Sequence, residues 1–197
     1  MKEEMYSYRY PRPAVTADCV IFGFDGTSLQ VLLIERGNEP YKGKWAFPGG
    51  FVNEDESCEQ GALRELQEET GLTNVSVEQF HTFSDPNRDP RTRVITVAYY
   101  ALVSIQDVQG ADDAARAAWF ALDDVPPLAF DHDAILREAL KRLRERYLLY
   151  PDSFKQLNEK FSPKQLQTFI EKYSTPHHKG NPSQPPQGGG APSGSLS

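Results

Sequence analysis

The sequence is poor in cysteine and has no long hydrophobic run, and each shortage excludes a class of protein. Its 197 residues include two cysteines, Cys19 and Cys58, whose separation fits neither a disulfide framework nor a metal-binding pair. No stretch approaches the roughly 18 apolar residues of a membrane-spanning helix, and residues 1–10 contain no apolar core of a signal peptide. We therefore expect a cytoplasmic protein with no membrane partner.

The sequence also lacks an excess of basic charge. Asp and Glu number 28 against 21 Lys and Arg, for a net charge of −7. Residues 1–130 hold 21 acids and 11 bases, so this part alone carries −10. A surface of that sign repels phosphate backbones, which makes a nucleic-acid partner unlikely, whereas divalent cations suit it.

Composition divides the chain into three parts. Residues 174–197 are dominated by Pro, Gly and Ser, with too few apolar side chains to offset the entropy of ordering, so we expect a disordered tail. Residues 1–149 are expected to form one domain. Residues 150–173 are expected to form a short helical extension, in which Ser162-Pro163 begins a helix.

Apolar and β-branched runs predict a series of strands. The first two, residues 14–24 and 29–34, flank Asp25-Gly26, which is typical of a β-hairpin. Residues 39–50 are rich in Pro and Gly and are expected to be loop around one short extended piece at residues 45–47. Further expected elements are strands at residues 75–83, 93–104 and 118–122, and a polar loop at residues 84–92.

Two segments have the spacing of helices. Ser57 and Gln60 match a capping box, and apolar residues recur at helical intervals until Gly71, which predicts a helix over residues 57–70. Apolar residues along one face predict a second helix over residues 131–149.

Three carboxylates share one face of the first helix. Glu65, Glu68 and Glu69 fall within an arc of about 100°, at 100° per residue. Like charges this close repel, and they oppose the helix dipole near its C-terminus, so a cation should compensate them. Mg²⁺ with oxygen ligands is the natural candidate. The alternative is a solvated acidic helix face, which is common.

The segment around these carboxylates matches the pattern G-x5-E-x7-R-E-U-x-E-E-x-G-U, where U is apolar. The matching residues are Gly50, Glu56, Arg64, Glu65, Leu66, Glu68, Glu69, Gly71 and Leu72. This resembles the signature of the Nudix hydrolases. The resemblance implies an α/β fold, an α/β/α sandwich with a mixed sheet, which uses Mg²⁺ or Mn²⁺ to hydrolyse a nucleoside diphosphate linked to another moiety.

The resemblance also implies roles for individual residues. Glu65, Glu68 and Glu69 would be metal ligands or their helpers, with the Gly49 carbonyl as a further ligand. Glu56, Arg64 and Glu68 would be catalytic residues, and Arg64 would pair with Glu56 and tie the preceding loop to the helix. The alternative for Arg64 is a plain intrahelical ion pair.

Residues 81–103, together with residues 36–50, resemble the ADP-ribose pyrophosphatases and the Nudix-type regulators of NAD synthesis. Substrate contacts are expected from four guanidinium groups, those of Arg36, Arg88, Arg91 and Arg93, because such groups bind diphosphate or ribose oxygens bidentately. For any single arginine, pairing with Asp85 or Asp89 on a solvated loop is an equal alternative.

One position departs from that subgroup, because Arg116 stands where its members usually have an acidic residue before Trp119-Phe120. The catalytic base therefore stays unassigned, with Glu68 as a candidate. Trp45 and Trp119 are expected in the core, and His81 and His132 are expected to be structural. The alternating Tyr6, Tyr8 and Tyr10 are expected to pack against the fold or a second subunit, which leaves a homodimer open.

Two functions compete. The first is an enzyme that hydrolyses ADP-ribose to AMP and ribose 5-phosphate. The second is an ADP-ribose-sensing transcriptional regulator, because residues 150–173 resemble the opening of a winged helix. No basic recognition helix follows them in this sequence, and the metal-binding pattern is complete, so the enzyme is favoured.

Overall fold

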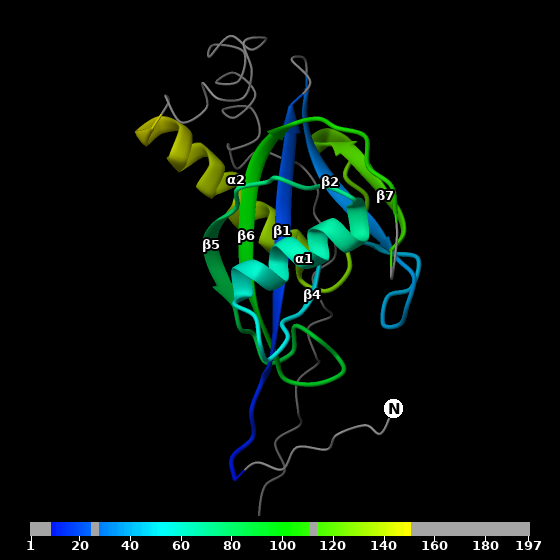
Figure 1. Ribbon diagram of the computed structural model, residues 1–197, viewed down its shortest axis with the longest axis vertical. Helices are drawn as coiled ribbons and strands as arrows, with labels where there is room; N and C mark the ends of the chain where they lie inside the picture. Colours follow the sequence, from blue (N-terminus) through cyan, green and yellow to red (C-terminus); the bar gives the residue numbers. More distant parts are fainter. Residues whose placement is uncertain (1–8, 25–27, 111–113, 151–197) are drawn as a thin grey trace, which may run out of the picture.

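The computed structural model describes residues 9–24, 28–110 and 114–150. At its centre lies a seven-stranded mixed sheet in the order β3-β2-β1-β6-β5, with β4 paired to β1 and β7 paired to β2 (Figure 1). The central strand β1 runs parallel to β6 and antiparallel to β2 and β4. The strands are β1 (Ala14–Phe24), β2 (Leu29–Arg36), β3 (Trp45–Ala46), β4 (Gly49–Phe51), β5 (Glu78–Phe83), β6 (Val94–Ser104) and β7 (Ala114–Ala121).

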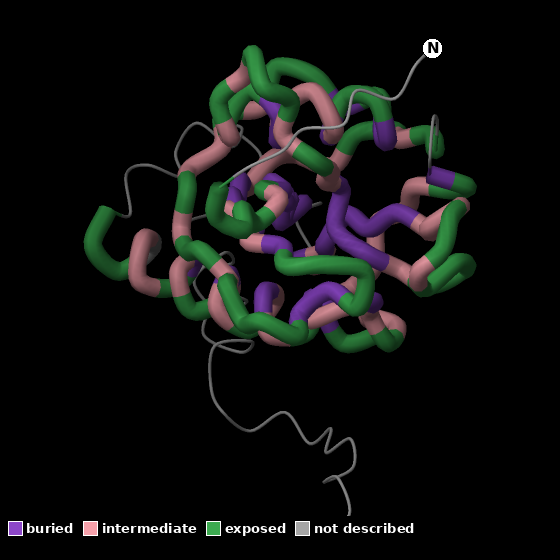
Figure 2. The backbone as a smooth tube through the Cα atoms, turned by 90° about the horizontal axis from the view of Figure 1, so that it is seen from below, coloured by how far each residue is buried: buried purple, intermediate pink, exposed green. Residues whose placement is uncertain are grey.

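Helices cover the two faces of this sheet. Successive side chains of a strand point to opposite faces, so β1 contributes to two cores. Cys19 and Ile21 pack with Leu66 of α1 (Cys58–Thr70), whereas Val20 and Phe22 pack with residues of α2 (His132–Leu149). The buried backbone lies in the middle of the molecule with exposed segments around it (Figure 2). The expected α/β/α sandwich is confirmed.

Local signals placed most elements correctly. The first two strands pair antiparallel, with Phe24 opposite Leu29, although the turn between them lies outside the described residues. Helix α1 begins after the N-cap Ser57, whose capping box with Gln60 is present. It ends at Gly71, whose φ of 72° is the left-handed conformation that glycine tolerates. A single-turn 3₁₀ helix, Leu122–Asp124, precedes α2.

Three strand assignments need correction. Strand β4 was expected to be loop, because Gly49-Gly50 has low strand propensity; it forms through backbone pairing with β1. Strand β7 begins at Ala114 instead of residue 118, since pairing with β2 extends an alanine-rich segment. Strand β5 begins at Glu78 instead of residue 75.

Some expectations concern residues outside the described part of the chain. These are the extension beyond Tyr150, the tail at residues 174–197, and Tyr6 and Tyr8. Tyr10 is 69% exposed. None of the helices within the described residues has the length and apolar character needed to cross a membrane.

Candidate active site

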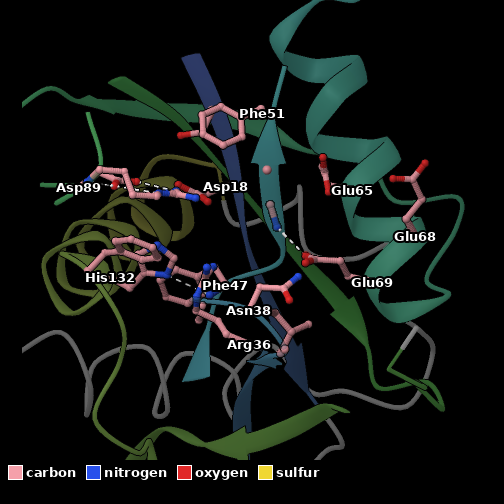
Figure 3. Close-up of a pocket in the computed structure, with 18 of the residues that line it drawn as sticks. Asp18, Arg36, Asn38, Phe47, Phe51, Glu65, Glu68, Glu69, Asp89 and His132 are labelled. Atoms are coloured by element: carbon pink, nitrogen blue, oxygen red, sulfur yellow. Dashed lines mark hydrogen bonds and ion pairs between the residues drawn. The ribbon is translucent and has the colours of Figure 1, made fainter. Parts of the chain in front are cut away.

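A cavity of about 490 Å³ opens at one end of the sheet. Helix α1 and strand β4 supply its acidic wall, with Glu65, Glu68 and Glu69. Loop 84–93, the end of β2 and the start of α2 supply an opposite wall of guanidinium and aromatic groups (Figure 3). The two walls meet at Asp18 of β1.

The acidic wall is held by contacts between α1 and β4. The backbone N–H of Gly49 donates to Glu69 Oε2 at 2.9 Å, and Glu69 is only 6% exposed. Burial, together with the nearby carboxylates of Glu65 and Asp18, raises the pKa of Glu69 to about 8 against the opposing effect of that hydrogen bond. A buried carboxylate beside two others is the setting in which a cation stabilises the charged form.

Two glycines allow this close approach. A Cβ atom on Gly50 would collide with the Glu65 carboxylate, and one on Gly49 would collide with Ala17 O and with Asp18. Any side chain at either position would push the helix carboxylates or Asp18 away from β4. The sequence Gly49-Gly50 therefore sets how tightly the carboxylates gather.

Arg64 connects the loop before α1 to the acidic wall. Its Nε and Nη2 donate to Glu56 at 3.0 and 2.6 Å, which is the pairing expected from the sequence. These bonds, with the N–H of Asn53, lower the pKa of Glu56 to about 2. Arg64 Nη1 also donates to Glu65 and Glu68, at 2.8 and 3.0 Å, so the alternative intrahelical pair is present too.

The carboxylates suit a hard divalent cation by their chemistry. The side-chain atoms that Glu65, Glu68 and Glu69 offer as metal ligands are carboxylate oxygens, which Mg²⁺ and Mn²⁺ prefer. Within the described residues no three His, Cys, Asp or Glu side chains converge as a metal cluster. The physical reason lies in the contacts above, because Arg64 holds Glu65 and Glu68 while Gly49 holds Glu69.

The opposite wall alternates guanidinium and aromatic groups. The guanidinium carbon of Arg36 lies 4.8 Å from the centre of the Phe130 ring. Arg91 lies 5.9 Å from the same ring and 5.3 Å from that of Phe51. Burial lowers the pKa of Arg36, and the positive charge of Arg91 lowers it further. Two guanidinium groups this close favour an anion in the cavity between them.

The four arginines expected to contact substrate differ in their positions. Arg36 and Arg91 line the cavity, and Arg91 also forms a fork with Asp89 at 3.0 and 2.7 Å, the alternative considered for it. Arg88 lines the cavity too, but it donates two hydrogen bonds to Asp131, at 3.0 and 2.8 Å. Arg93 donates to the carbonyl of Ser84 and is not among the lining residues.

Several cavity residues were not singled out from the sequence. Asp18 is 6% exposed and accepts a hydrogen bond of 2.6 Å from the Thr96 hydroxyl. A single charged residue inside the apolar strand Ala14–Phe24 was the available signal. Phe51 and Phe130 gave none, because Phe51 stands at an unspecified position of the pattern that begins at Gly50, Phe130 lies outside that pattern, and tertiary contacts bring both to the arginines.

His132 is structural, as expected. The backbone N–H of Phe47 donates to its Nδ1 at 3.0 Å, and the two rings stack with centres 5.2 Å apart. Burial lowers the pKa of His132, so the imidazole is neutral and can accept this bond. His81 is exposed, and Trp45 and Trp119 are half-buried at the edges of the two cores.

Arg116 has a structural partner outside the cavity. Its Nε donates to Glu35 at 2.8 Å, and its guanidinium lies 5.1 Å from the Trp45 ring. Arg116 is not among the lining residues, and Asp112 and Asp113 lie outside the described part of the chain. Arg116 therefore takes no part in the described cavity.

Comparison with known proteins agrees with this architecture. The family model described as the NUDIX domain matches residues 12–143. The chain belongs to the NUDIX family. Two curated NUDIX relatives are equally similar in sequence.

The first is the ADP-ribose pyrophosphatase of Methanocaldococcus jannaschii, 38% identical over 141 residues, which covers 71% of this chain and 81% of that protein. The second is the ADPR-responsive transcriptional repressor NtrR of Acinetobacter baylyi, 38% identical over 151 residues. That alignment covers 73% of this chain but only 60% of the repressor.

A solved structure carries a ligand. The NUDIX domain of Shewanella oneidensis NrtR, crystallised with ADP-ribose, is 40% identical and superposes with a TM-score of 0.65. The match covers 68% of this chain and 90% of that domain. The residues matched by the family model, 12–143, include every residue that lines the cavity.

Proposed function

We propose that the protein hydrolyses ADP-ribose, or a closely similar nucleoside diphosphate derivative, to AMP and a phosphorylated partner such as ribose 5-phosphate. The observation that carries the proposal is one cavity with two opposed walls. Carboxylates of α1 suit a divalent cation, and the guanidinium groups of Arg36 and Arg91 line the facing wall, where Arg91 is also paired with Asp89. A diphosphate between these walls would be neutralised from both sides.

The carboxylates of α1 and the Gly49 carbonyl form the proposed cation site. Glu65, Glu68 and Glu69, with the Gly49 carbonyl, would hold Mg²⁺ or Mn²⁺. Such a cation offsets the charge of the diphosphate and lowers the pKa of water.

Arg36 and Arg91 would bind the diphosphate oxygens. Glu56 is held ionised by Arg64, so it serves to position Arg64 and is unsuited to be a general base. Glu68, the most exposed of the three helix carboxylates, is the candidate base.

Similarity to known enzymes supports the substrate. The pyrophosphatase relative matches this chain over most of its own length, and the ligand in the related NUDIX domain is ADP-ribose. The cavity also contains aromatic rings, Phe51 and Phe130, that can stack against a base or pack against a sugar.

A substrate panel tests the proposal. Purified full-length protein with Mg²⁺ should release AMP and ribose 5-phosphate from ADP-ribose, and EDTA should abolish the reaction. NADH, diadenosine polyphosphates and oxidised dGTP, measured in parallel, should react more slowly. Faster turnover of oxidised dGTP would replace the proposed substrate with a nucleoside triphosphate.

An ADP-ribose-sensing regulator is the second candidate, favoured by the equal similarity to the repressor NtrR. In that case the protein would bind an operator near 10⁻⁸ M or tighter, release it on addition of ADP-ribose, and show little turnover. An enzyme should bind duplex DNA only in the non-specific range of about 10⁻⁴ to 10⁻⁶ M or more weakly. Band-shift titrations with and without ADP-ribose separate the two.

A further inference from the structure

Arg88 is nearly buried and is paired with carboxylates of the protein. Its Nε and Nη2 donate to the two oxygens of Asp131 at 3.0 and 2.8 Å, and its Nη2 lies 3.8 Å from Asp18 Oδ2. The Arg88 side chain is only 4% exposed. A nearly buried guanidinium that is held bidentately by one carboxylate and faces a second has its positive charge compensated before any substrate arrives. Arg91 is also held bidentately, by Asp89, but its side chain is 41% exposed.

Asp131 is used in an unusual way for its position. It is the N-cap residue of α2, yet its side chain makes no capping hydrogen bond. An Asp at this position normally accepts from the first turn of the helix, which stabilises the helix. Here both carboxylate oxygens accept hydrogen bonds from Arg88 instead, so the side-chain capping bond of α2 is absent and α2 is connected to loop 84–93.

This connection joins two of the three segments that form the arginine wall, which is the wall of Arg36, Arg91 and Phe130 opposite the carboxylates. Phe130 and His132 flank Asp131 in sequence and line the cavity. Phe130 has a φ of 53°, a conformation that a bulky residue holds only when surrounding contacts fix it. On the other side of the pair, Arg91 follows Arg88 on the same loop, and its guanidinium lies over the Phe130 ring.

We propose that Arg88 and Asp131 form a clamp that positions the arginine wall, and that neither residue contacts the substrate. The inference rests on the hydrolase function proposed above, and it replaces the sequence-based expectation that Arg88 binds substrate. Both are therefore positioning residues, and loosening them should weaken substrate binding more than chemistry.

The deciding variant is Asp131→Asn, because asparagine is an equally good N-cap residue but loses the charge that holds Arg88. With ADP-ribose and Mg²⁺, we expect KM to rise roughly tenfold while kcat stays within about twofold.

Arg88→Lys keeps the buried charge but loses the bidentate geometry, so it should also raise KM. The double variant should be no worse than the more affected single variant. Asp133→Asn, an exposed Asp in the first turn of the same helix, is the matched control and should leave KM unchanged.

A second readout does not depend on activity. Without ligand, trypsin should cut loop 84–93 after Arg91 or Arg93 faster in Asp131→Asn and Arg88→Lys than in the wild type or Asp133→Asn, as followed by intact mass.

If Arg88 instead bound substrate, Asp131→Asn would free it, KM would stay level or fall, and the cutting rate would not change. Either result would overturn the clamp. If the wild type does not hydrolyse ADP-ribose, the proposed function fails, while the trypsin comparison still decides whether the clamp exists.

Discussion

The two walls of the cavity are built in different ways. The acidic wall comes from one continuous segment, residues 49–69, in which helix α1 presents three carboxylates to strand β4. The arginine wall is assembled from Arg36 on β2, Arg91 on loop 84–93 and Phe130 before α2. The first wall depends on local helix geometry, whereas the second depends on contacts between distant segments. Substitutions in the two walls should therefore have different consequences.

The largest effect is expected in the acidic wall. Glu65→Gln and Glu69→Gln should each lower kcat at least about a hundredfold, because they remove charge from the metal-binding face without changing shape. The melting temperature without metal should stay level or rise, since the substitution relieves repulsion among Glu65, Glu69 and Asp18. Steady-state kinetics and thermal unfolding in EDTA measure both quantities. Near wild-type turnover would remove these residues from the site.

The arginine wall should respond mainly in substrate binding. Arg91→Ala should raise KM for ADP-ribose roughly tenfold, because it removes one guanidinium facing the cavity. Arg93→Ala is the matched control, since Arg93 binds the Ser84 carbonyl and is not among the lining residues. Initial-rate kinetics over a range of ADP-ribose concentrations measure the change. An equal rise in KM in the two variants would mean that Arg91 makes no contact with the substrate that Arg93 lacks.

His132, next to Phe130 in the chain, should contribute to the pH dependence of stability. Its pKa is lowered by burial from an ordinary value of 6.5, so the unfolded chain binds a proton on this side chain more readily than the folded protein. Stability should therefore fall as pH drops below about 6.5, by at most roughly 1.4 kcal/mol per pH unit from this group. Glu69, whose pKa is raised to about 8, acts in the opposite sense over this range, because the folded protein keeps a proton there that the unfolded chain has released. Urea unfolding at pH 7.5 and 5.5 should therefore show that the wild type loses more stability, or gains less, on acidification than His132→Asn does. An unchanged difference would assign the acid sensitivity to other groups.

The smallest effect is expected at the start of α1. Ser57→Ala removes one half of the capping box and should lower the free energy of unfolding by about 1 kcal/mol. Because Ser57 lies outside the cavity lining, kcat in the same preparation should remain near the wild-type value. Urea unfolding and steady-state kinetics measure the two quantities. A large loss of kcat would show that the acidic wall depends on how α1 begins and not only on its carboxylates.

The sequence by itself determined the elements whose signals are local. The capping box at Ser57, the terminal glycine at Gly71 and the interval between Glu65 and Glu69 act within a few residues, so periodicity was enough to place α1 and its acidic face. The pairing of Arg64 with Glu56 spans only eight residues and is present as expected. The strand at Gly49-Gly50 was not predicted from the sequence, because its hydrogen bonds are made to β1, which is far away in the chain.

Only the tertiary structure decided which arginines face the cavity. Arg88 and Arg91 are equivalent in the sequence, each a basic residue on a polar loop, and Arg93 follows them as the first residue of the next expected strand. Asp131, 43 residues after Arg88, accepts hydrogen bonds from the Arg88 guanidinium. The Ser84 carbonyl accepts one from Arg93, which is not among the residues that line the cavity. The physical reason is that a guanidinium takes the direction of the partner that best satisfies its donors, and that partner is placed by the folding of a separate element.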